Sequence, residues 1–345
     1  MNQVSAGAPG EALPPVANEP QHKKRGFKLG DYAERYALVI AWIIVVAVFS
    51  ILAPQSYFNV QNFTTMFGTQ TTLVILALAL LIPLTAGDYD LSVAATLTMS
   101  GMIVAVLNAQ HGVPIGLAIL IALSFGALVG LVNGFFVMVF GIDPFIVTLG
   151  IGTVITGLVL WISSSQTISG VSGWLSNWVV VHRLFGISLE FYYGLILCAV
   201  LFYVFDFMAI GRRILFVGRG TNVARLSGIR VGRVRWGCFI AAGMIAALGG
   251  VLYTGTSGAA DPVSGLSFLL PAFAAAFLGS TTITPGRFNP WGTFIAVYFL
   301  VAGITGLAIM GVQTWVQSAF YGAALVIAVS ASQVVKKRRE KAARL

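Results

Sequence analysis

Two carboxylates and a glycine interrupt an otherwise apolar stretch near residue 90. The residues there are Gly87-Asp88-Tyr89-Asp90-Leu91-Ser92, and they follow an uncharged run over residues 71–85. An aspartate that faces lipid at the centre of a bilayer costs about 2.5–3.5 kcal/mol on insertion scales. We therefore expect Asp88, Asp90 and Ser92 to face protein, trapped water or a transport path, or to lie at a helix end.

Two structures would explain this stretch. It could be a polar turn that joins two membrane spans. It could also be a break in a helix at a transport pathway, because interrupted spans are tolerated where they line a cavity. In the second case Asp88 and Asp90 would accept hydrogen bonds from a cargo, and in both cases they could cap a helix.

Catalytic chemistry is the competing explanation. An intramembrane aspartyl protease needs two carboxylates that are close enough to share a proton. Residues two apart on a regular helix point to different sides, so Asp143 or Asp261 would have to supply the second carboxylate. The sequence has no G-x-x-x-x-G-K-[ST] phosphate loop, no H-E-x-x-H motif and no G-x-S-x-G motif, so we expect no ATP-binding, metal or serine-nucleophile site of these types.

The composition places the chain in a membrane. Of its 345 residues, 58% are hydrophobic and 9% are charged, and the mean hydropathy is +0.91. A soluble domain of this length could not cover its surface with so few polar residues. Long apolar runs and 39 glycines indicate helices rather than a β-barrel, whose strands would alternate in polarity. We expect an all-α membrane protein.

Basic clusters predict the topology. The ranges 23–35, 212–235 and 336–344 contain five, seven and six of the 20 Lys and Arg residues, and such clusters mark cytoplasmic segments. The net charge of +9 thus points to lipid head groups rather than to nucleic acid. Ten apolar segments fit around the clusters, with approximate limits 37–53, 71–86, 91–107, 115–140, 144–162, 190–209, 236–254, 266–282, 291–310 and 315–333.

This arrangement divides the chain into three parts. We expect a disordered basic tail over residues 1–36, a membrane domain over 37–334 and a second basic tail over 335–345. Six spans before the loop 211–235 and four after it leave both termini and this loop in the cytoplasm. Asp143 is suited to cap the span that starts at Pro144.

Two patterns inside the spans concern helix packing. Gly126, Gly130 and Gly134 form an i, i+4, i+8 row that would let a neighbouring helix approach closely. Cys198 and Cys238 both lie in expected spans, so we expect them to pack rather than to form a disulfide or a metal site.

A weak internal repeat is present. Asp90 lies 24 residues before Pro114, and Asp261 lies 24 residues before Pro285. Each aspartate precedes an expected span and each proline follows one. The two units are five spans apart, so they would be inverted relative to each other in the membrane, as repeats in transporters often are.

The loop 211–235 carries seven arginines and no acidic residue. Asn222 is suited to cap a short helix that runs to about Ser227, and Gly228 is suited to end it. The loop either contacts anionic lipid head groups or docks a cytoplasmic partner through this helix.

Three stretches resemble the permease subunits of ribose-type ATP-binding-cassette sugar importers. Residues 87–92 resemble the family's G-G-x-D-L-S motif, and residues 222–229 resemble its N-x-x-A-x-x-S-G-I loop. Residues 278–293 resemble its L-G-G-x-x…G-G-x-G…G-T segment. The likeness covers roughly residues 40–335, although Asp88, Ser280 and Pro285 stand where the family often has Gly.

The resemblance implies a ten-helix subunit of a bacterial inner membrane. It would pair with a second permease copy, a cytoplasmic ATPase and an extracytoplasmic solute-binding protein. The permease would be no enzyme and would hold no cofactor, because the ATPase binds the ATP. The cargo would be a pentose, another monosaccharide or a polyol. It would pass Asp88, Asp90 and Ser92 by alternating access.

The resemblance also assigns the loops. The solute-binding protein would dock on outer loops that include residues 163–189. The ATPase would grip the loop at Asn222, Ala224, Arg225, Ser227 and Gly228. A stand-alone ion-coupled secondary transporter remains the alternative, in which Asp88, Asp90 and Asp261 could supply the coupling-ion site.

Overall fold

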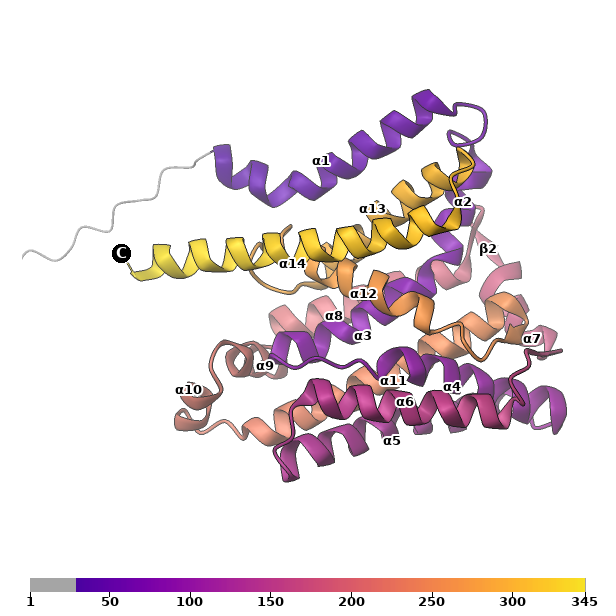
Figure 1. Cartoon of the computed structure of the whole chain (residues 1–345), viewed down its shortest axis with the longest axis horizontal. Helices are drawn as coiled ribbons and strands as arrows, with labels where there is room; N and C mark the ends of the chain where they lie inside the picture. The colour runs from indigo at the N-terminus through magenta and orange to yellow at the C-terminus, as the bar shows by residue number, and fades with distance from the viewer. Residues whose placement is uncertain (1–28, 345) are drawn as a thin grey trace, which may run out of the picture.

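The computed structural model of the chain describes residues 29–344, and it describes side chains over 35–334. Within this part the chain is almost entirely helical, with four strands of two residues each. The ten main helices, shown in Figure 1, are α1 (Leu29–Leu52), α3 (Thr71–Ala86), α4 (Val93–Ala105), α5 (Ile115–Val139), α6 (Pro144–Ile162), α8 (Leu189–Phe207), α11 (Val231–Ser257), α12 (Leu266–Gly279), α13 (Pro290–Ile309) and α14 (Thr314–Arg344). The predicted all-α membrane fold is confirmed.

Each expected span corresponds to one of these helices, but not all of them can cross a membrane alone. In the described part of the chain, eight helices are long and apolar enough. The pair α2 (Val60–Thr69) and α3, which meet at a 40° bend, can form a ninth span. Helix α12 has 14 residues and is about 21 Å long, which is short of a hydrocarbon core of about 30 Å.

The ends of the chain are more helical than expected. Helix α1 begins at Leu29, within the segment 1–36 that was predicted to be a disordered tail, and residues 1–28 lie outside the described part. Helix α14 continues to Arg344, through the predicted tail 335–345.

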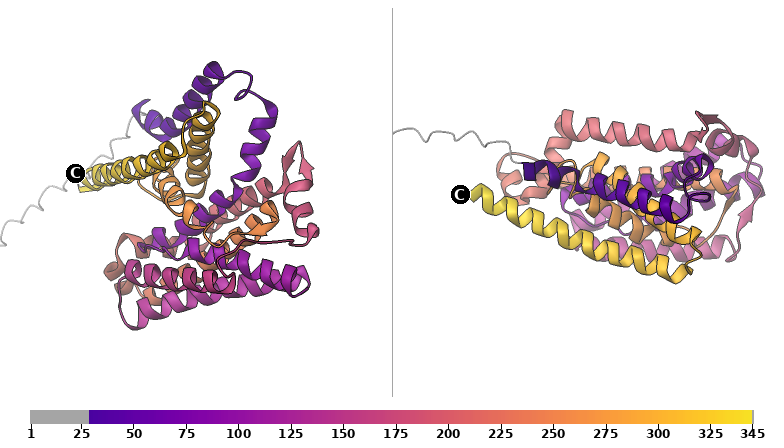
Figure 2. Two further views of the ribbon diagram at one scale, coloured as in Figure 1. Left: turned by 45° about the vertical axis from the view of Figure 1, so that its right-hand side comes forward. Right: turned by 90° about the horizontal axis from the view of Figure 1, so that it is seen from above.

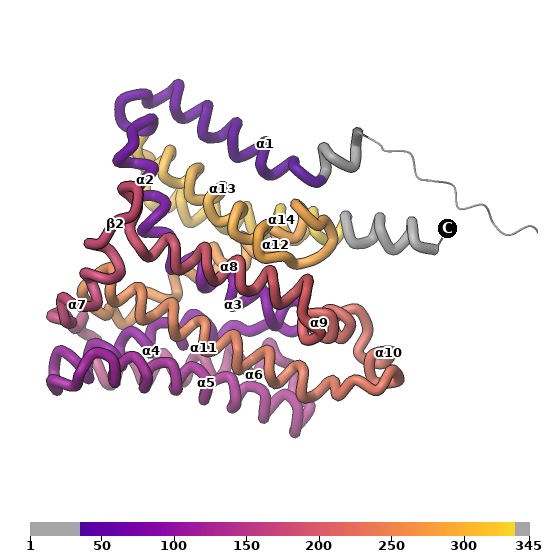
Figure 3. The backbone as a smooth tube through the Cα atoms, turned by 180° about the vertical axis from the view of Figure 1, so that it is seen from behind, coloured from indigo at the N-terminus to yellow at the C-terminus, as the bar shows by residue number. Residues whose placement is uncertain are grey.

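The basic segments gather at one end of the bundle, which we call the basic end. The start of α1 and the end of α14 lie there (Figure 1). The helices α9 (Ala209–Arg219) and α10 (Thr221–Leu226) lie there too (Figure 3). The N–H of Ile283, in the loop after α12, donates to the carbonyl oxygen of Arg35 at 3.0 Å. Arg287 in the same loop pairs with Asp206 at the end of α8, at 3.3 Å.

The opposite end carries the segment between α6 and α8. This segment contains the strand β1 (Ile168–Ser169), the turns α7 (Gly173–Ser176) and η2 (Asn177–Val181), and a hairpin of β2 (Arg183–Leu184) and β3 (Ile187–Ser188). It is joined to the π-helical turn η1 (Val106–Gln110) after α4, where the side-chain oxygen of Asn108 accepts a hydrogen bond from the N–H of Ser172 at 2.7 Å.

Helix α3 lies at the centre of the bundle. All 16 of its residues are buried, and it packs against α8, α9, α11, α12 and α13. A helix that is apolar on all sides is typical of such a position. By contrast, α1 and α14 border the bundle (Figure 2), and only 6% of the residues in their spanning windows are buried inside the chain.

The predicted glycine row allows α5 and α11 to touch. A Cβ atom on Gly130 would lie 2.3 Å from the carbonyl oxygen of Phe239 in α11, and one on Gly126 would lie 2.4 Å from that of Gly243. The side chain of Trp236 occupies the space beside Gly134. Cys198 and Cys238 are buried and free, as expected.

The packing of the helices follows the internal repeat. Helix α4 packs against α5, α6 and α11, and α12 packs in the corresponding way against α13, α14 and α3. Helix α4 leads away from the basic end, toward Asn108, whereas α12 leads to the loop that bonds Arg35 at the basic end. The two units therefore run in opposite directions (Figure 1).

Candidate functional site at the helix break

The stretch at residues 87–92 is a non-helical segment that joins the end of α3 to the start of α4. Helix α3 ends where Gly87 takes the left-handed conformation, with φ of 93°. The N–H of Gly87 donates to the carbonyl of Leu84 at 3.1 Å, and that of Asp88 to the carbonyl of Pro83 at 2.9 Å. This closing turn favours glycine, because the left-handed conformation carries a steric penalty for residues with a Cβ atom.

The segment is buried rather than solvated. The exposed fractions of Asp88, Asp90 and Ser92 are 3%, 1% and 1%. A polar turn at the membrane surface would leave these side chains in water. Of the two structures that the sequence allowed, the structure therefore has a buried break between two helices.

Asp90 and Ser92 form a polar turn that starts α4. The Oδ1 atom of Asp90 accepts hydrogen bonds from the backbone N–H of Ser92 at 3.0 Å and from its hydroxyl at 2.6 Å. The Oγ atom of Ser92 accepts a hydrogen bond from Nδ2 of Asn133, in α5, at 2.8 Å. Sequence analysis missed Asn133, although an amide in the middle of an apolar span was a visible signal.

Asn133 leaves an unused hydrogen-bonding atom in this site. Its side chain is fully buried, and its Oδ1 atom has no hydrogen-bond partner among the described residues. Buried polar atoms are usually paired with protein or water. The group of Asp90, Ser92 and Asn133 is thus the polar core of the break.

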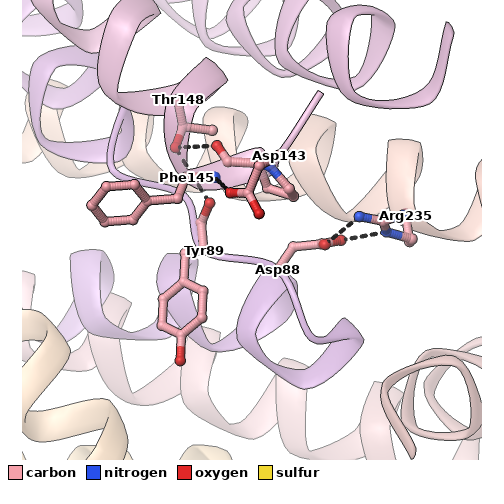
Figure 4. A network of polar contacts seen from close by, with 7 residues as sticks. Asp88, Tyr89, Asp143, Phe145, Thr148 and Arg235 are labelled. Carbon is pink, nitrogen blue, oxygen red and sulfur yellow. Dashed lines mark hydrogen bonds and ion pairs between the residues drawn. The ribbon is translucent and has the colours of Figure 1, made fainter. Parts of the chain in front are cut away.

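Asp88 is bound to an arginine that is distant in sequence. Its two oxygens accept hydrogen bonds from Nε and an Nη of Arg235, at 2.8 and 2.5 Å (Figure 4). Arg235 lies near the start of α11, which is also the end of the basic loop. Sequence analysis treated this arginine only as one of seven in that loop.

Thr148, in α6, forms hydrogen bonds with the middle of the segment 87–92. The Oγ1 atom of Thr148 accepts a hydrogen bond from the N–H of Leu91 at 3.0 Å, and it lies 3.3 Å from the carbonyl oxygen of Tyr89 (Figure 4). Helix α6 begins as predicted, because the Oδ1 atom of Asp143 accepts from the N–H of Phe145 at 2.8 Å. The segment is thus held by side chains from three helices.

Tyr89 is the side chain of this segment that remains accessible. It is 42% exposed, and its ring stacks near Phe273 and Phe277 of α12, with centroids 6.4 Å from each. In Figure 4 it points away from Arg235. The accessible side chain of the break is therefore an aromatic ring, whereas its carboxylates are buried.

The basic loop folds into the two short helices α9 and α10. The predicted cap by Asn222 is wrong, because α10 begins at Thr221 after Gly220 and has no side-chain cap. Gly228 ends the helical turn as expected, with φ of 79°. The hydroxyl of Ser227 donates to the carbonyl of Val223 at 3.0 Å.

Exposure divides the predicted docking residues of α10 into two groups. Ala224 is fully buried and packs with Val217 and Val231, so it holds α10 against α9 and α11. The apolar side chains that project from the helix are Val223, 59% exposed, and Leu226, 89% exposed. Asn222, Arg225, Ser227 and Gly228 are exposed beside them.

The break and the basic loop are neighbours in the structure. A Cβ atom on Gly218, near the end of α9, would lie 2.0 Å from the carbonyl oxygen of Thr85, in the last turn of α3. Helix α9 therefore abuts the backbone of α3 directly before the break. The ion pair of Asp88 with Arg235 connects the same two regions.

The geometry does not support a carboxylate dyad or a metal site. Asp88 is engaged by Arg235 and Asp90 by Ser92, so they have separate partners. No group of three or more His, Cys, Asp or Glu side chains within the described range could hold a metal ion.

Residues 60–329 match the family described as branched-chain amino acid transport system / permease component. The chain belongs to this permease family. The permease is a multi-pass subunit of an inner-membrane transport system and not an enzyme, and a separate ATPase hydrolyses ATP. This membership excludes the aspartyl protease and the stand-alone secondary transporter.

Several curated proteins resemble the permease over nearly their whole length. A D-allose transport system permease protein of Escherichia coli (strain K12) is 30% identical over 91% of this chain and 96% of its own. An autoinducer 2 import system permease protein of Salmonella paratyphi A is 28% identical, over 90% and 94%. A ribose import permease protein of Haemophilus influenzae is 25% identical, over 92% and 99%. No solved structure matches the chain.

Proposed function

We propose that the permease imports a small neutral sugar or a related polyol across the bacterial inner membrane. The relatives named for D-allose and ribose support this cargo class. The observation that carries the proposal is the buried break at residues 87–92, which places backbone and polar groups inside the membrane domain. Irregular backbone within a membrane domain is tolerated where it is buried in protein or borders a water-filled cavity.

In this proposal the break forms one wall of the sugar pathway. Asp90 and Ser92 fix the shape of the break. Asp88 acts on the pathway indirectly, because its hydrogen bonds to Arg235 position the break. Tyr89 contacts the sugar, because its ring is the accessible group of the segment. An aromatic face beside hydrogen-bonding groups suits a sugar, which has apolar C–H faces and polar hydroxyls.

The partners in this proposal are a cytoplasmic ATPase, an extracytoplasmic solute-binding protein and a second copy of the permease. The basic end faces the cytoplasm, so both termini and α10 lie inside, next to anionic lipid. The segment 163–189 then lies outside, where the binding protein docks. Closure of the ATPase on ATP shifts the helices and opens the pathway on alternate sides, and the permease needs no cofactor of its own.

The ATPase is proposed to receive α10. Leu226 and Val223 project from it as apolar anchors, with Asn222, Arg225 and Ser227 at their rim, while Ala224 and Gly228 set the shape of the helix. A few side chains that fill desolvated pockets of a partner often dominate an interface.

The cargo is tested by transport. Proteoliposomes that contain the permease with its ATPase and binding protein should take up labelled D-ribose or D-allose when ATP is supplied. An ionophore that collapses ion gradients should not reduce this uptake. ATP-driven uptake of labelled leucine without uptake of either sugar would overturn the proposed cargo.

The docking site is tested by co-purification with the ATPase in mild detergent. We expect Leu226→Asp to reduce the recovered ATPase by about tenfold or more, because loss of an interface anchor costs about 2 kcal/mol or more. Phe185→Asp is the matched control, since Phe185 is also 89% exposed but lies in the hairpin at the opposite end. Equal recovery with both variants would show that α10 is not the docking site.

A further inference from the structure

The ion pair between Asp88 and Arg235 joins the helix break to the basic loop. The two residues are 147 positions apart in the sequence, and their side chains are 4% and 22% exposed. Two nitrogens of the guanidinium bind the two carboxylate oxygens. Such a fork-shaped contact fixes orientation as well as distance, so the two backbones it connects move together.

At one side of the pair lies the segment that the ATPase is proposed to hold. Only the residues 227–230 separate α10 from the start of α11. The buried contacts of Val217, Ala224 and Val231 tie α9, α10 and α11 into one unit. Arg235 is one turn further along α11, so a displacement of α10 is passed to its guanidinium.

At the other side lies the non-helical segment that joins α3 to α4. Asp88 directly follows Gly87, which takes the left-handed conformation at the end of α3. Glycine has a wider range of backbone conformations than other residues, because it lacks a Cβ atom. Beyond Asp88, residues 89–92 lead to the start of α4 at Val93, and the side chains of Thr148 and Asp90 accept hydrogen bonds from their backbone. A displacement of Asp88 would therefore also displace Tyr89 and the turn formed by Asp90 and Ser92.

We propose that Arg235, through its paired contact with Asp88, is a positioning residue that transmits the movement of the ATPase-docking segment to the helix break. This inference rests on the proposed function. Asp88 stands where the resembling family often has Gly, a residue that cannot form this carboxylate–arginine link.

A second ion pair gives a matched control. Asp206 and Arg287 also lie at the basic end, but they make one contact at 3.3 Å and their side chains are 33% and 29% exposed. They join the end of α8 to the loop after α12 and do not touch the break. A general need for charge pairing at this end would make both pairs equally important.

The test measures the ratio of sugar uptake to ATP hydrolysis in proteoliposomes. The permease is reconstituted with its ATPase and binding protein, and labelled D-ribose and D-allose are the probes. We expect Asp88→Asn and Arg235→Gln to keep the ATPase rate within about twofold while uptake falls by about tenfold, within the usual range of coupling between distant sites. Asp206→Asn should keep the wild-type ratio.

Two further variants distinguish loss of the ion pair from misfolding. Arg235→Lys keeps the charge but loses the fork, and it should show an intermediate ratio. The exchanged pair Asp88→Arg with Arg235→Asp should transport more than either single exchange. A wild-type ratio in Arg235→Gln, in Arg235→Lys, or in both would overturn the inference. Absence of sugar uptake by the wild-type permease would instead overturn the proposed function.

Discussion

The break before α4 and the break before α12 contain the same kind of aspartate turn, but different contacts hold the two breaks in place. The Oδ1 atom of Asp90 accepts a hydrogen bond from the N–H of Ser92 at 3.0 Å, and that of Asp261 accepts from the N–H of Val263 at 2.9 Å. Asp90 is buried, whereas Asp261 is partly exposed. The internal repeat thus preserves the local turn and not its surroundings.

The contacts that hold the two breaks are of different kinds. Arg235, Thr148 and Asn133 bind the first break through side chains. The second break contains the strand β4 (Ala259–Ala260), which pairs antiparallel with β1. It is also held by Thr98 of α4, whose hydroxyl accepts a hydrogen bond from the N–H of Gly265 at 3.1 Å. Backbone pairing tolerates most substitutions, but side-chain contacts depend on the residue. We therefore expect function to be far more sensitive to substitution at the first break.

The largest effect should come from Asp90. Asp90→Ala removes two hydrogen bonds to a buried carboxylate, and we expect the free energy of unfolding to fall by about 3 kcal/mol, since such bonds contribute about 1.5–3 kcal/mol each. Asp90→Asn keeps an oxygen that can accept both bonds, so it should retain most of this stability. Thermal unfolding in detergent measures the difference between the variants.

The same pair of variants separates two roles of Asp90. If the charge contributes to the pathway, Asp90→Asn will be stable and well expressed but will transport poorly. Normal uptake by Asp90→Asn would show that the charge of Asp90 has no role in transport, and that Asp90 only stabilises the turn before α4.

Two threonines allow a matched comparison of the breaks. Thr148 and Thr98 are both buried, and each accepts a hydrogen bond from a backbone N–H of its break. Valine at either position leaves that N–H unpaired, so we expect Thr148→Val and Thr98→Val each to cost about 1–3 kcal/mol of stability.

Uptake should distinguish these two variants. At a temperature where both are folded, Thr148→Val should transport less than Thr98→Val, because only Thr148 holds the break that bears Tyr89. Equal uptake would remove the functional distinction between the breaks.

The smallest effect should come from Asp261→Asn. The amide can keep the bond to the N–H of Val263, and the position is partly exposed, so the change in stability should stay within about 0.5 kcal/mol. Uptake should be unchanged under the same assay. A strong loss of uptake would mean that the second break carries a charge-dependent role as well.

Local patterns allowed much of this structure to be predicted. The apolar segments predicted the helices, the pair Asp143-Pro144 predicted the start of α6, and the spacing of Gly126 and Gly130 predicted a close neighbour. Each of these signals lies within a few residues of its structural effect. The sequence also predicted that the carboxylates of Asp88 and Asp90 avoid lipid, but it left open whether they lie in a polar turn or in a buried break.

Contacts between distant residues could not be predicted in this way. Seven arginines share the basic loop, and nothing local distinguishes Arg235 as the partner of Asp88. The exposure of Leu226 and the burial of Ala224 were also hidden, because a helix of six residues is too short to show a period. The sequence therefore predicted a short helix in this loop but not which of its side chains project from it.

The distance between Asp88 and Arg235 along the chain has a consequence for biosynthesis. Ribosomes add roughly 5–20 residues per second, so roughly 7–30 seconds pass between the synthesis of one residue and that of the other. During this time α3 can lie in lipid, since it is apolar on every side. The carboxylate of Asp88, which follows α3, does not yet have Arg235 as its partner. Asp88 follows the end of α3, so its carboxylate need not enter lipid with that helix. We expect Asp88 to become buried only after α11, which carries Arg235, has been made.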